Sequence, residues 1–148
     1  MDFLNIGHEV LSVDKLVEKV KAPNCGAVSV FIGTTRNNFN QLEVSTLYYE
    51  AYEQMALKSL KEICAEVRAK WPAIENIAIS HRLGEVGVGE MSVILAISSP
   101  HRSDSIAAIS FTMDQLKSKV PIWKKEVYCS ADKAEWKENK ECKWASSQ

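Results

Sequence analysis

No apolar run in the sequence is long enough to cross a membrane. The longest runs, at residues 27–33 and 93–97, fall far short of the roughly 20 consecutive apolar residues that a spanning helix needs. The first residues also do not have the pattern of a secretory signal peptide, because Asp2 stands where a basic segment is expected and no apolar stretch follows it. We therefore expect a soluble protein of the cytosol.

Cysteine motifs are missing as well. None of the four cysteines is in C-x-x-C spacing or has a histidine at zinc-ligand spacing: Cys25, Cys64, Cys129 and Cys142. A disulfide framework is unusual in a cytosolic chain of this size, and free cysteines commonly behave as small buried or half-buried thiols. The sequence therefore predicts neither a metal site nor a bound cofactor.

The net charge of the chain is small, but positive charge is concentrated in one segment. The net charge of −1 argues against general binding to nucleic acids or membranes, and a stacking-aromatic motif of the kind found in RNA-binding modules is absent. Residues 117–143, however, hold eight lysines and five acidic residues, a local excess of three positive charges. That excess suggests a site for a small anion rather than a track for a polyanion.

The remaining composition is that of one globular domain over residues 1–148. With 46% hydrophobic and 25% charged residues, the chain can fill a real core. Helical spacing predicts helices at residues 12–20, 53–71 and 103–120, with Ser12 or Asp14 capping the first. Strands are predicted at residues 45–50, 77–81 and 91–98, and at 27–33, where the strand should be buried. Residues 34–42 are expected to form an exposed loop, and the segment from Ile122 is left unassigned.

Strands interleaved with two long helices predict an α/β or α+β sandwich with a mixed or antiparallel sheet, and we favour the α+β class. The apolar stripe expected on the helix at residues 103–120 consists of Ile106, Ile109, Met113, Leu116 and Val120. The glycine-rich stretch at residues 84–89 is not a phosphate loop, because no G-K-[ST] follows it and no helix opens on it.

The segment from Pro100 to Ser103 lies where an apolar strand ends and a helix begins. A helix N-terminus offers free N–H groups and a partial positive charge, so adding His101 and Arg102 makes a strong anion site. The local sequence fits an alternative equally well, in which Ser103 caps the helix while His101 and Arg102 are solvated.

Two other basic sites are weaker candidates. The pair His81-Arg82 precedes a turn and has no helix N-terminus beside it, so we expect it to have a surface or structural role. Arg36 lies in a loop after a strand, where it could bind an anion or a partner, although an ordinary surface arginine is the simpler interpretation.

Lys117 and the segment from Pro121 to Glu126 form the next candidate. Partial desolvation of a lysine near an aromatic ring and an apolar helix end makes a general acid–base role feasible near neutral pH. Glu126 could hold such a lysine in place. The alternative, which charge alone favours, is a solvated basic helix end that complements the helix dipole.

Taken in order along the chain, these and neighbouring segments resemble the large subunit of molybdopterin synthase. The resemblance runs from about Ser12 to Trp144, and one small departure is Pro100, where many members have alanine. The segments at 139–142 and 144–145 resemble the animal branch of the family. The main matching segments are Cys25-Gly26-Ala27, Gly33-Thr34-Thr35-Arg36-Asn37, Tyr49-Glu50-Ala51-Tyr52, Lys70-Trp71-Pro72, His81-Arg82-Leu83-Gly84, His101-Arg102, Lys117 and Pro121-Ile122-Trp123-Lys124-Lys125-Glu126.

The resemblance implies a substrate, cyclic pyranopterin monophosphate, and a product, molybdopterin. It implies a small ubiquitin-like partner whose C-terminal Gly-Gly carries a thiocarboxylate and supplies two sulfurs per product. The implied fold is an α/β hammerhead-like domain with a small added β subdomain. The implied assembly is a heterotetramer, with a central dimer of this chain and a small subunit at each end.

The same resemblance gives roles to the candidate residues. Phosphate binding falls to Arg36, His101 and Arg102, and positioned lysines can move protons and stabilise oxyanions. We expect Lys117 to be the main catalytic group and Lys124 to assist it, with Lys125 and Glu126 as supporting residues or substrate contacts. The alternative is a non-catalytic adaptor that binds a ubiquitin-like partner or a small anion through the same basic surface.

The predicted helix at residues 103–120 raises a distance problem. Arg102 and Lys117 stand at its opposite ends, about 22 Å apart at 1.5 Å per residue, and nothing in its apolar run breaks it. Both side chains cannot contact one small pterin from the same chain. Either the two ends belong to different sites, or a second copy brings its own His101 and Arg102 beside Lys117. We expect the shared site, since a two-fold dimer is the commonest way to bring such ends together and the resemblance implies a central dimer.

Overall fold

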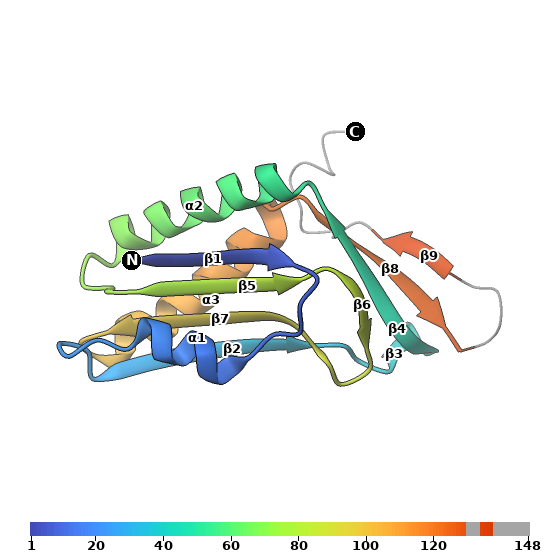
Figure 1. Ribbon diagram of the computed structural model, residues 1–148, viewed down its shortest axis with the longest axis horizontal. Helices are drawn as coiled ribbons and strands as arrows, with labels where there is room; N and C mark the ends of the chain where they lie inside the picture. Colours follow the sequence, from blue (N-terminus) through green and yellow to red (C-terminus); the bar gives the residue numbers. More distant parts are fainter. Residues whose placement is uncertain (130–133, 138–148) are drawn as a thin grey trace.

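A four-stranded mixed sheet carries the larger part of the fold (Figure 1). The computed structural model describes residues 1–129 and 134–137, and the strands of this sheet lie in the order β1 (Asp2–Gly7), β5 (Ile77–Arg82), β7 (Met91–Ser99) and β2 (Ala27–Thr34). β1 and β5 are parallel, whereas the β5–β7 and β7–β2 pairs are antiparallel. The prediction of a mixed sheet is confirmed.

A second sheet lies at one end of the first and forms a small β subdomain (Figure 1). Its strands in spatial order are β3 (Asn38–Phe39), β4 (Leu42–Ala51), β8 (Ile122–Tyr128) and β9 (Ala134–Lys137), while β6 (Gly84–Gly87) also pairs with β4. All of these pairs are antiparallel. The α+β class and the added β subdomain are therefore confirmed.

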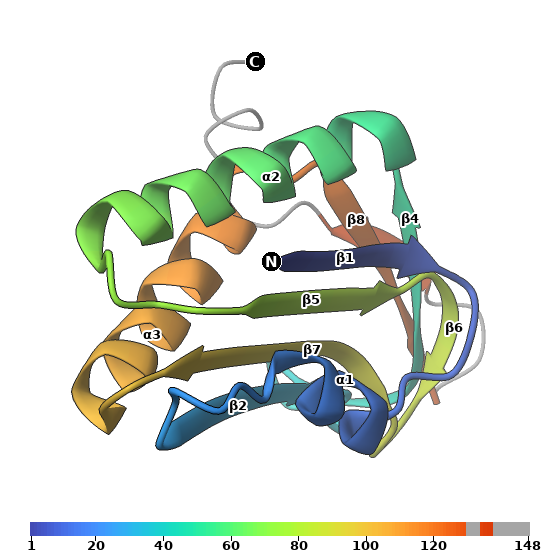
Figure 2. The ribbon, with the colours of Figure 1, turned by 60° about the vertical axis from the view of Figure 1, so that its left-hand side comes forward.

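The helices of the described chain cover both faces of the first sheet (Figure 2). Side chains alternate between the faces of β7. Ile94 and Ala96 pack in the cluster that includes α1, whereas Val93, Leu95 and Ile97 pack in the cluster of the two long helices. The helices are α1 (Val13–Val20) on one face and α2 (Glu53–Lys70) and α3 (Arg102–Lys119) on the other. None of these helices is both long and apolar enough to cross a membrane.

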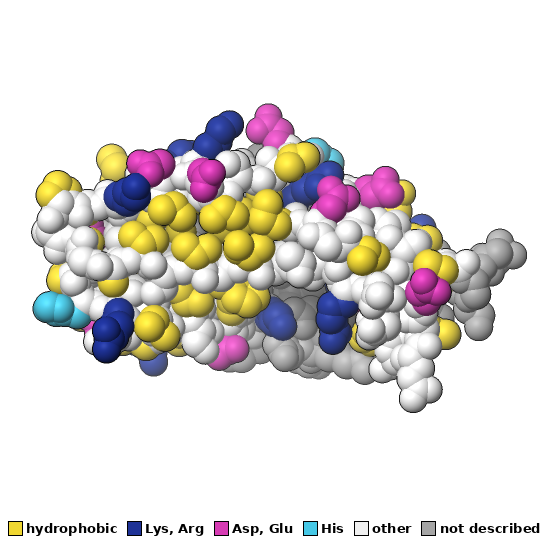
Figure 3. Space-filling view, turned by 90° about the horizontal axis from the view of Figure 1, so that it is seen from below, with side chains coloured by type: hydrophobic (Ala, Val, Ile, Leu, Met, Phe, Trp, Pro, Cys, Tyr) yellow, Lys and Arg dark blue, Asp and Glu magenta, His cyan; other side chains and the backbone are white. Residues whose placement is uncertain are grey.

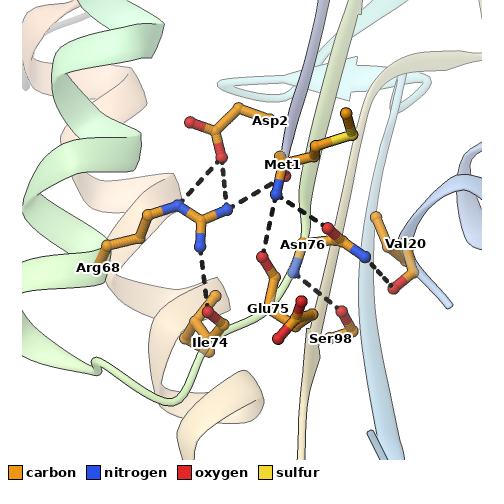
Figure 4. A network of polar contacts seen from close by, with 8 residues as sticks. All are labelled: Met1, Asp2, Val20, Arg68, Ile74, Glu75, Asn76 and Ser98. Atoms are coloured by element: carbon orange, nitrogen blue, oxygen red, sulfur yellow. Dashed lines mark hydrogen bonds and ion pairs between the residues drawn. The ribbon is translucent and has the colours of Figure 1, made fainter. Parts of the chain in front are cut away.

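Arg68 fastens α2 to the first sheet (Figure 4). Its guanidinium donates two hydrogen bonds to Asp2 Oδ1, at 2.7 and 3.2 Å, and one each to the carbonyls of Met1 and Ile74, at 3.1 and 3.0 Å. These contacts hold β1, which the sequence did not predict, beside the start of β5.

The two helix starts show one correct and one wrong capping prediction. Ser12 caps α1 as expected, because its hydroxyl accepts a backbone N–H at 3.4 Å. α3 begins at Arg102, so Ser103 lies inside the helix and is not its cap. The hydroxyl of Ser99, at the end of β7, accepts the backbone N–H of Ser105 at 3.2 Å instead.

β2 is an edge strand rather than the buried strand that its apolar sequence predicts. On one face of β2, Val28 packs in the cluster of α1, but Val30 and Ile32 are 38% and 40% exposed. The prediction was wrong because apolar residues on both faces of a strand indicate cover on both sides, and α1 covers only part of this face.

The predicted apolar stripe of α3 is only partly correct. Its buried positions are Ser105, Ala108, Thr112 and Leu116, whereas Ile106 is 58% exposed. Small residues bring α3 close to β2, where the hydroxyls of Ser29 and Ser105 lie 2.8 Å apart. The buried face of α3 therefore consists mainly of small side chains, which allow close packing, and not of the larger apolar side chains that periodicity predicted.

The predicted loop at residues 34–42 and the segment from Ile122 both contain strands. Residues 34–42 include β3 and a two-residue hairpin turn at Asn40 and Gln41, whose φ angles of 48° and 66° match the turn that joins tightly paired strands. The segment from Ile122 begins with β8. Cys142 and the animal-type segments at 139–142 and 144–145 lie outside the described residues.

Candidate active site

A pocket of about 590 Å³ opens between the first sheet, the C-terminal end of α3, and strands β4 and β8. Its lining comes from the end of β2, neighbouring residues of β5 and β7, and the last turns of α3. From the described part of the chain, three cationic side chains line it: Arg36, Lys117 and Lys124. Figure 3 shows a hollow bordered by Lys and Arg side chains beside a band of hydrophobic side chains.

The reversal of the chain after α3 brings the two lysines together. α3 ends at Lys119, and Pro121 prevents its continuation because proline has no N–H and clashes with the preceding turn. β8 then returns along β4. Lys117 in the last helical turn, where the dipole favours a cation, and Lys124 in β8 therefore line one pocket.

Arg36 reaches the pocket from the segment that follows β2. The preceding residue, Thr35, is buried, and its hydroxyl donates to the carbonyl of Val86 at 3.3 Å. Its backbone N–H donates to the carbonyl of Glu90 at 3.1 Å. These bonds fix the backbone on which the exposed Arg36 stands.

The pocket also has an uncharged polar wall formed by Tyr49, His81 and Ser92. His81 is only 5% exposed, and its ring packs edge-on against Tyr49, with centroids 4.9 Å apart and planes at 68°. Burial lowers the pKa of His81 to about 4 and raises the pKa of Tyr49, because desolvation disfavours the charged form of each group. Both rings are therefore neutral at pH 7.

Glu126 is a buried acidic residue beside the pocket. It is 2% exposed, and the hydroxyl of Tyr128 donates a hydrogen bond to its Oε2 at 2.6 Å. Glu126 and Lys124 are two residues apart in β8, so their side chains are on the same face of the strand. This position fits a supporting residue that does not itself line the pocket.

The other predicted residues lie elsewhere in the single chain. Lys125 is on the opposite face of β8 from Lys124, where its cross-strand neighbour in β4 is Tyr48. His101 and Arg102 line a separate pocket at the start of α3. The chain alone thus brings together Arg36, Lys117 and Lys124, but not His101 or Arg102.

Sequence reasoning missed the polar wall of the pocket. The pair His81-Arg82 has no helix N-terminus beside it, and on that ground the sequence predicts only a surface or structural role for it. The register of the sheet sets His81 opposite Val93 and Val93 opposite Gly33, so three strands contribute neighbouring residues to the pocket. The only local signal was that His81 ends an apolar strand, and that signal does not reveal which residues lie opposite.

Comparison with known proteins places the chain in a family. Residues 6–119 match the model of the family described as MoaE protein. The molybdopterin synthase catalytic subunit of Taeniopygia guttata is 54% identical over 147 residues, which span 99% of this chain and 94% of that protein. The subunit of the same name from Homo sapiens is 51% identical over 146 residues, with coverage of 99% and 76%.

A solved structure agrees with the sequence comparison. The crystal structure of molybdopterin synthase from Staphylococcus aureus superimposes with a TM-score of 0.85 at 36% identity, covering 89% of this chain and 94% of that one. A Burkholderia ambifaria MoaE protein gives a TM-score of 0.81 at 31% identity, over 99% and 97% of the two chains. The chain therefore belongs to the MoaE family, the family of molybdopterin synthase catalytic subunits.

Proposed function

We propose that this chain is a sulfurtransferase that converts cyclic pyranopterin monophosphate to molybdopterin. The observation that carries the proposal is the pocket where Arg36, Lys117 and Lys124 meet. The substrate carries a phosphate, and guanidinium and ammonium groups bind phosphate oxygens through charge-assisted hydrogen bonds. Membership of the MoaE family supports the same reaction.

The sulfur comes from a small ubiquitin-like partner with a C-terminal thiocarboxylate. Each transfer forms a carbon–sulfur bond to the pterin side chain and breaks a carbon–oxygen bond there, one oxygen leaving with the phosphate as the cyclic ester opens and the other leaving as water. Water then hydrolyses the acyl–sulfur link, so that the partner leaves with a carboxylate and the sulfur stays on the pterin. Two such transfers complete the dithiolene. A tail ending in Gly-Gly has no side chains near its end, so it is suited to enter a pocket between a helix and a strand.

The pocket residues divide the chemical work. Opening the cyclic phosphate and hydrolysing the acyl–sulfur link both require proton transfer and stabilised oxyanions, which positioned ammonium groups can supply. Lys117 is the proposed main acid–base or electrostatic group, and Lys124 assists it. Arg36 binds the phosphate, and Glu126 supports the lysines from within β8, whereas Lys125 lies on the opposite face of that strand.

A second copy of the chain completes the site with its own His101 and Arg102. α3 is one helix from Arg102 to Lys119, so the backbones of Arg102 and Lys117 are about 22 Å apart at 1.5 Å per residue. Long side chains close roughly 10 Å of that separation, which still leaves the two groups too far apart for one pterin.

The edge strand β2 supports a two-fold arrangement. Its start adjoins the start of α3, where the Gly26 N–H donates to the carbonyl of Pro100 at 3.2 Å, and its end lines the cationic pocket. A two-fold axis near the middle of β2 would set the start of one copy beside the end of the other. Exposed Val30, Ile32 and Ile106 offer apolar surface for this contact.

One assay tests the proposed reaction. The purified chain, a thiocarboxylated partner and the pterin precursor are combined, and the dithiolene product is measured. We expect Lys117→Ala to lose about 100-fold or more in rate, the usual contribution of a general acid–base residue, while its fold and partner binding persist.

Lys119→Ala is the matched control, two residues further along α3. It removes an ion pair with Glu66, 2.6 Å long and partly exposed, which contributes at most about 1 kcal/mol to stability. Its rate should be unchanged. A Lys117→Ala protein that retained about a third or more of the wild-type rate would contradict the catalytic assignment, because a non-catalytic adaptor would tolerate that change while an acid–base residue would not.

A further inference from the structure

We propose that His81 is a substrate-binding residue, whose Nε2 accepts a hydrogen bond from an N–H group of the pterin ring in the cationic pocket. The inference rests on the proposed function and adds to it, because it assigns recognition of the heterocycle as well as of the phosphate. His81 was otherwise expected to have a surface or structural role.

The hydrogen bond made by Nδ1 of His81 determines whether Nε2, on the other side of the imidazole ring, is a donor or an acceptor. Nδ1 of His81 lies 2.9 Å from the carbonyl oxygen of Arg82. A carbonyl oxygen can only accept, so Nδ1 donates and carries the proton of the neutral imidazole. Nε2 is then unprotonated and can only accept a hydrogen bond.

Within the described chain, Nε2 is an unpaired atom of a residue that lines the pocket. His81 lines the pocket, and no group of residues 1–129 forms a hydrogen bond with Nε2. The atom is also not among the fully enclosed unpaired side-chain atoms of the described chain, which are Arg82 Nε and Thr112 Oγ1. An acceptor without a partner among the described residues is therefore available to a ligand in this pocket.

The ring remains a neutral acceptor throughout the working pH range. Burial lowers the pKa of His81 to about 4. Among residues 1–129, the charged side chains that line the same pocket are Arg36, Lys117 and Lys124, all cationic. The pocket thus combines donors that suit a phosphate with an acceptor that the ionised oxygens of a cyclic phosphate cannot use, because both would be acceptors. A ligand with an anionic group and a ring rich in N–H donors, such as a pterin phosphate, matches both.

The neighbours of His81 hold it in one orientation. β5 pairs with β1 on one side and with β7 on the other, so the backbone of His81 is fixed within the sheet. The edge contact with Tyr49 restricts the ring, and Tyr49 lines the same pocket. A preformed acceptor of this kind contributes to affinity without having to be ordered on binding.

Two amide substitutions separate binding from a structural role. His81→Asn can place an N–H donor near the position of Nδ1 but nothing at Nε2. His81→Gln can place a carbonyl acceptor near the position of Nε2. The dissociation constant of the pterin substrate is measured by calorimetry for each variant and for wild type, together with competition by inorganic phosphate and the melting temperature.

We expect His81→Asn to weaken pterin binding about tenfold, the effect of losing one buried hydrogen bond, and His81→Gln to stay within about threefold of wild type. The affinity for inorganic phosphate should be unchanged in both. Equal pterin affinity in His81→Asn and wild type, a larger loss in His81→Gln than in His81→Asn, or an equal loss for phosphate would overturn the inference. If His81→Asn does not fold, His81→Phe takes its place with the same expectation, because it keeps a ring against Tyr49 and lacks the acceptor.

The two proposals fail in different ways. A wild-type chain that makes no dithiolene product with partner and precursor would refute the proposed function. A wild-type chain that makes product, with His81→Asn binding the pterin normally, would refute only the role of His81.

Discussion

A dimer that combines an Arg102→Ala chain with a Lys117→Ala chain should hold one intact active site. In the shared arrangement, each site joins Lys117 of one copy to Arg102 of the other. The Arg102→Ala chain keeps its own Lys117, which meets the unchanged Arg102 of its neighbour. The second site of the same dimer carries both substitutions and is inactive.

The size of the recovery follows from the symmetry. Random exchange at equal concentrations makes about half of the dimers mixed, and one working site in two then gives about a quarter of the wild-type rate. The parent variants should be far less active at low substrate. Arg102→Ala loses a charge-assisted phosphate contact, roughly 1.5–3 kcal/mol or about ten- to a hundredfold in affinity. Lys117→Ala loses about 100-fold or more in rate.

A mixture of wild type with the double variant Arg102→Ala/Lys117→Ala is the complementary test, because shared sites then lower the remaining activity instead of restoring it. With shared sites, both sites of a mixed dimer lack one residue, so only the wild-type dimers work and about a quarter of the activity remains. With sites confined to one chain, about half remains. Subunit exchange is verified by native mass spectrometry of tagged chains. No recovery in the first mixture and about half activity in the second would refute the shared site.

Three further predictions follow from individual residues. Arg102→Ala should weaken binding of the phosphorylated pterin by about ten- to a hundredfold. Arg82→Ala should weaken it much less, because Arg82 is paired with Glu90 at 3.0 Å and lies away from a helix N-terminus. Equal losses of affinity in the two variants, measured by calorimetry, would contradict this prediction. The unfolded chain protonates His81 near pH 6.5, whereas the pKa of His81 in the folded chain is about 4, so stability contributed by neutral His81 is present above pH 6.5 and lost as the pH falls. Wild type should therefore lose about 2 kcal/mol more unfolding free energy than His81→Phe between pH 7 and pH 5 in denaturant titrations, and parallel losses would count against it. Burial raises the pKa of Cys64 to about 12, so iodoacetamide at about pH 8 should label the exposed Cys129 but not Cys64 in the folded protein; peptide mass spectrometry that found equal labelling would argue against it.

The sequence predicted correctly those helices whose signals lie within the helix itself or directly beside it. α1 and α2 have apolar positions at helical spacing, a cap at Ser12 and a stop at Pro72. On the buried face of α3, Ser105 and Thr112 stand where apolar residues were expected, so periodicity indicated the wrong stripe. β1 was missed because it is held by β5, more than 70 positions further along the chain.

In the candidate site as well, residues close together in the sequence could be predicted, and residues brought together by long-range packing could not. Lys117 and Lys124 could be predicted to act together because they are seven positions apart, across a helix end marked by Pro121. His81 and Tyr49 could not, because they join the pocket only through strand register and a contact between two sheets. Those relations are set by long-range packing, which no single segment of the sequence contains.

The exposure of β2 connects the fold to the proposed assembly. Its sequence predicts a strand covered on both faces, yet Val30 and Ile32 are exposed in the single chain. Edge strands are commonly protected by charges or proline, and Ala27–Thr34 contains neither. Such an edge avoids indiscriminate pairing when one specific surface covers it, and a second copy can do this about a two-fold axis. In the proposed dimer the strand becomes buried as its sequence predicts, and the contact that buries it also carries Arg102 to the pocket of Lys117.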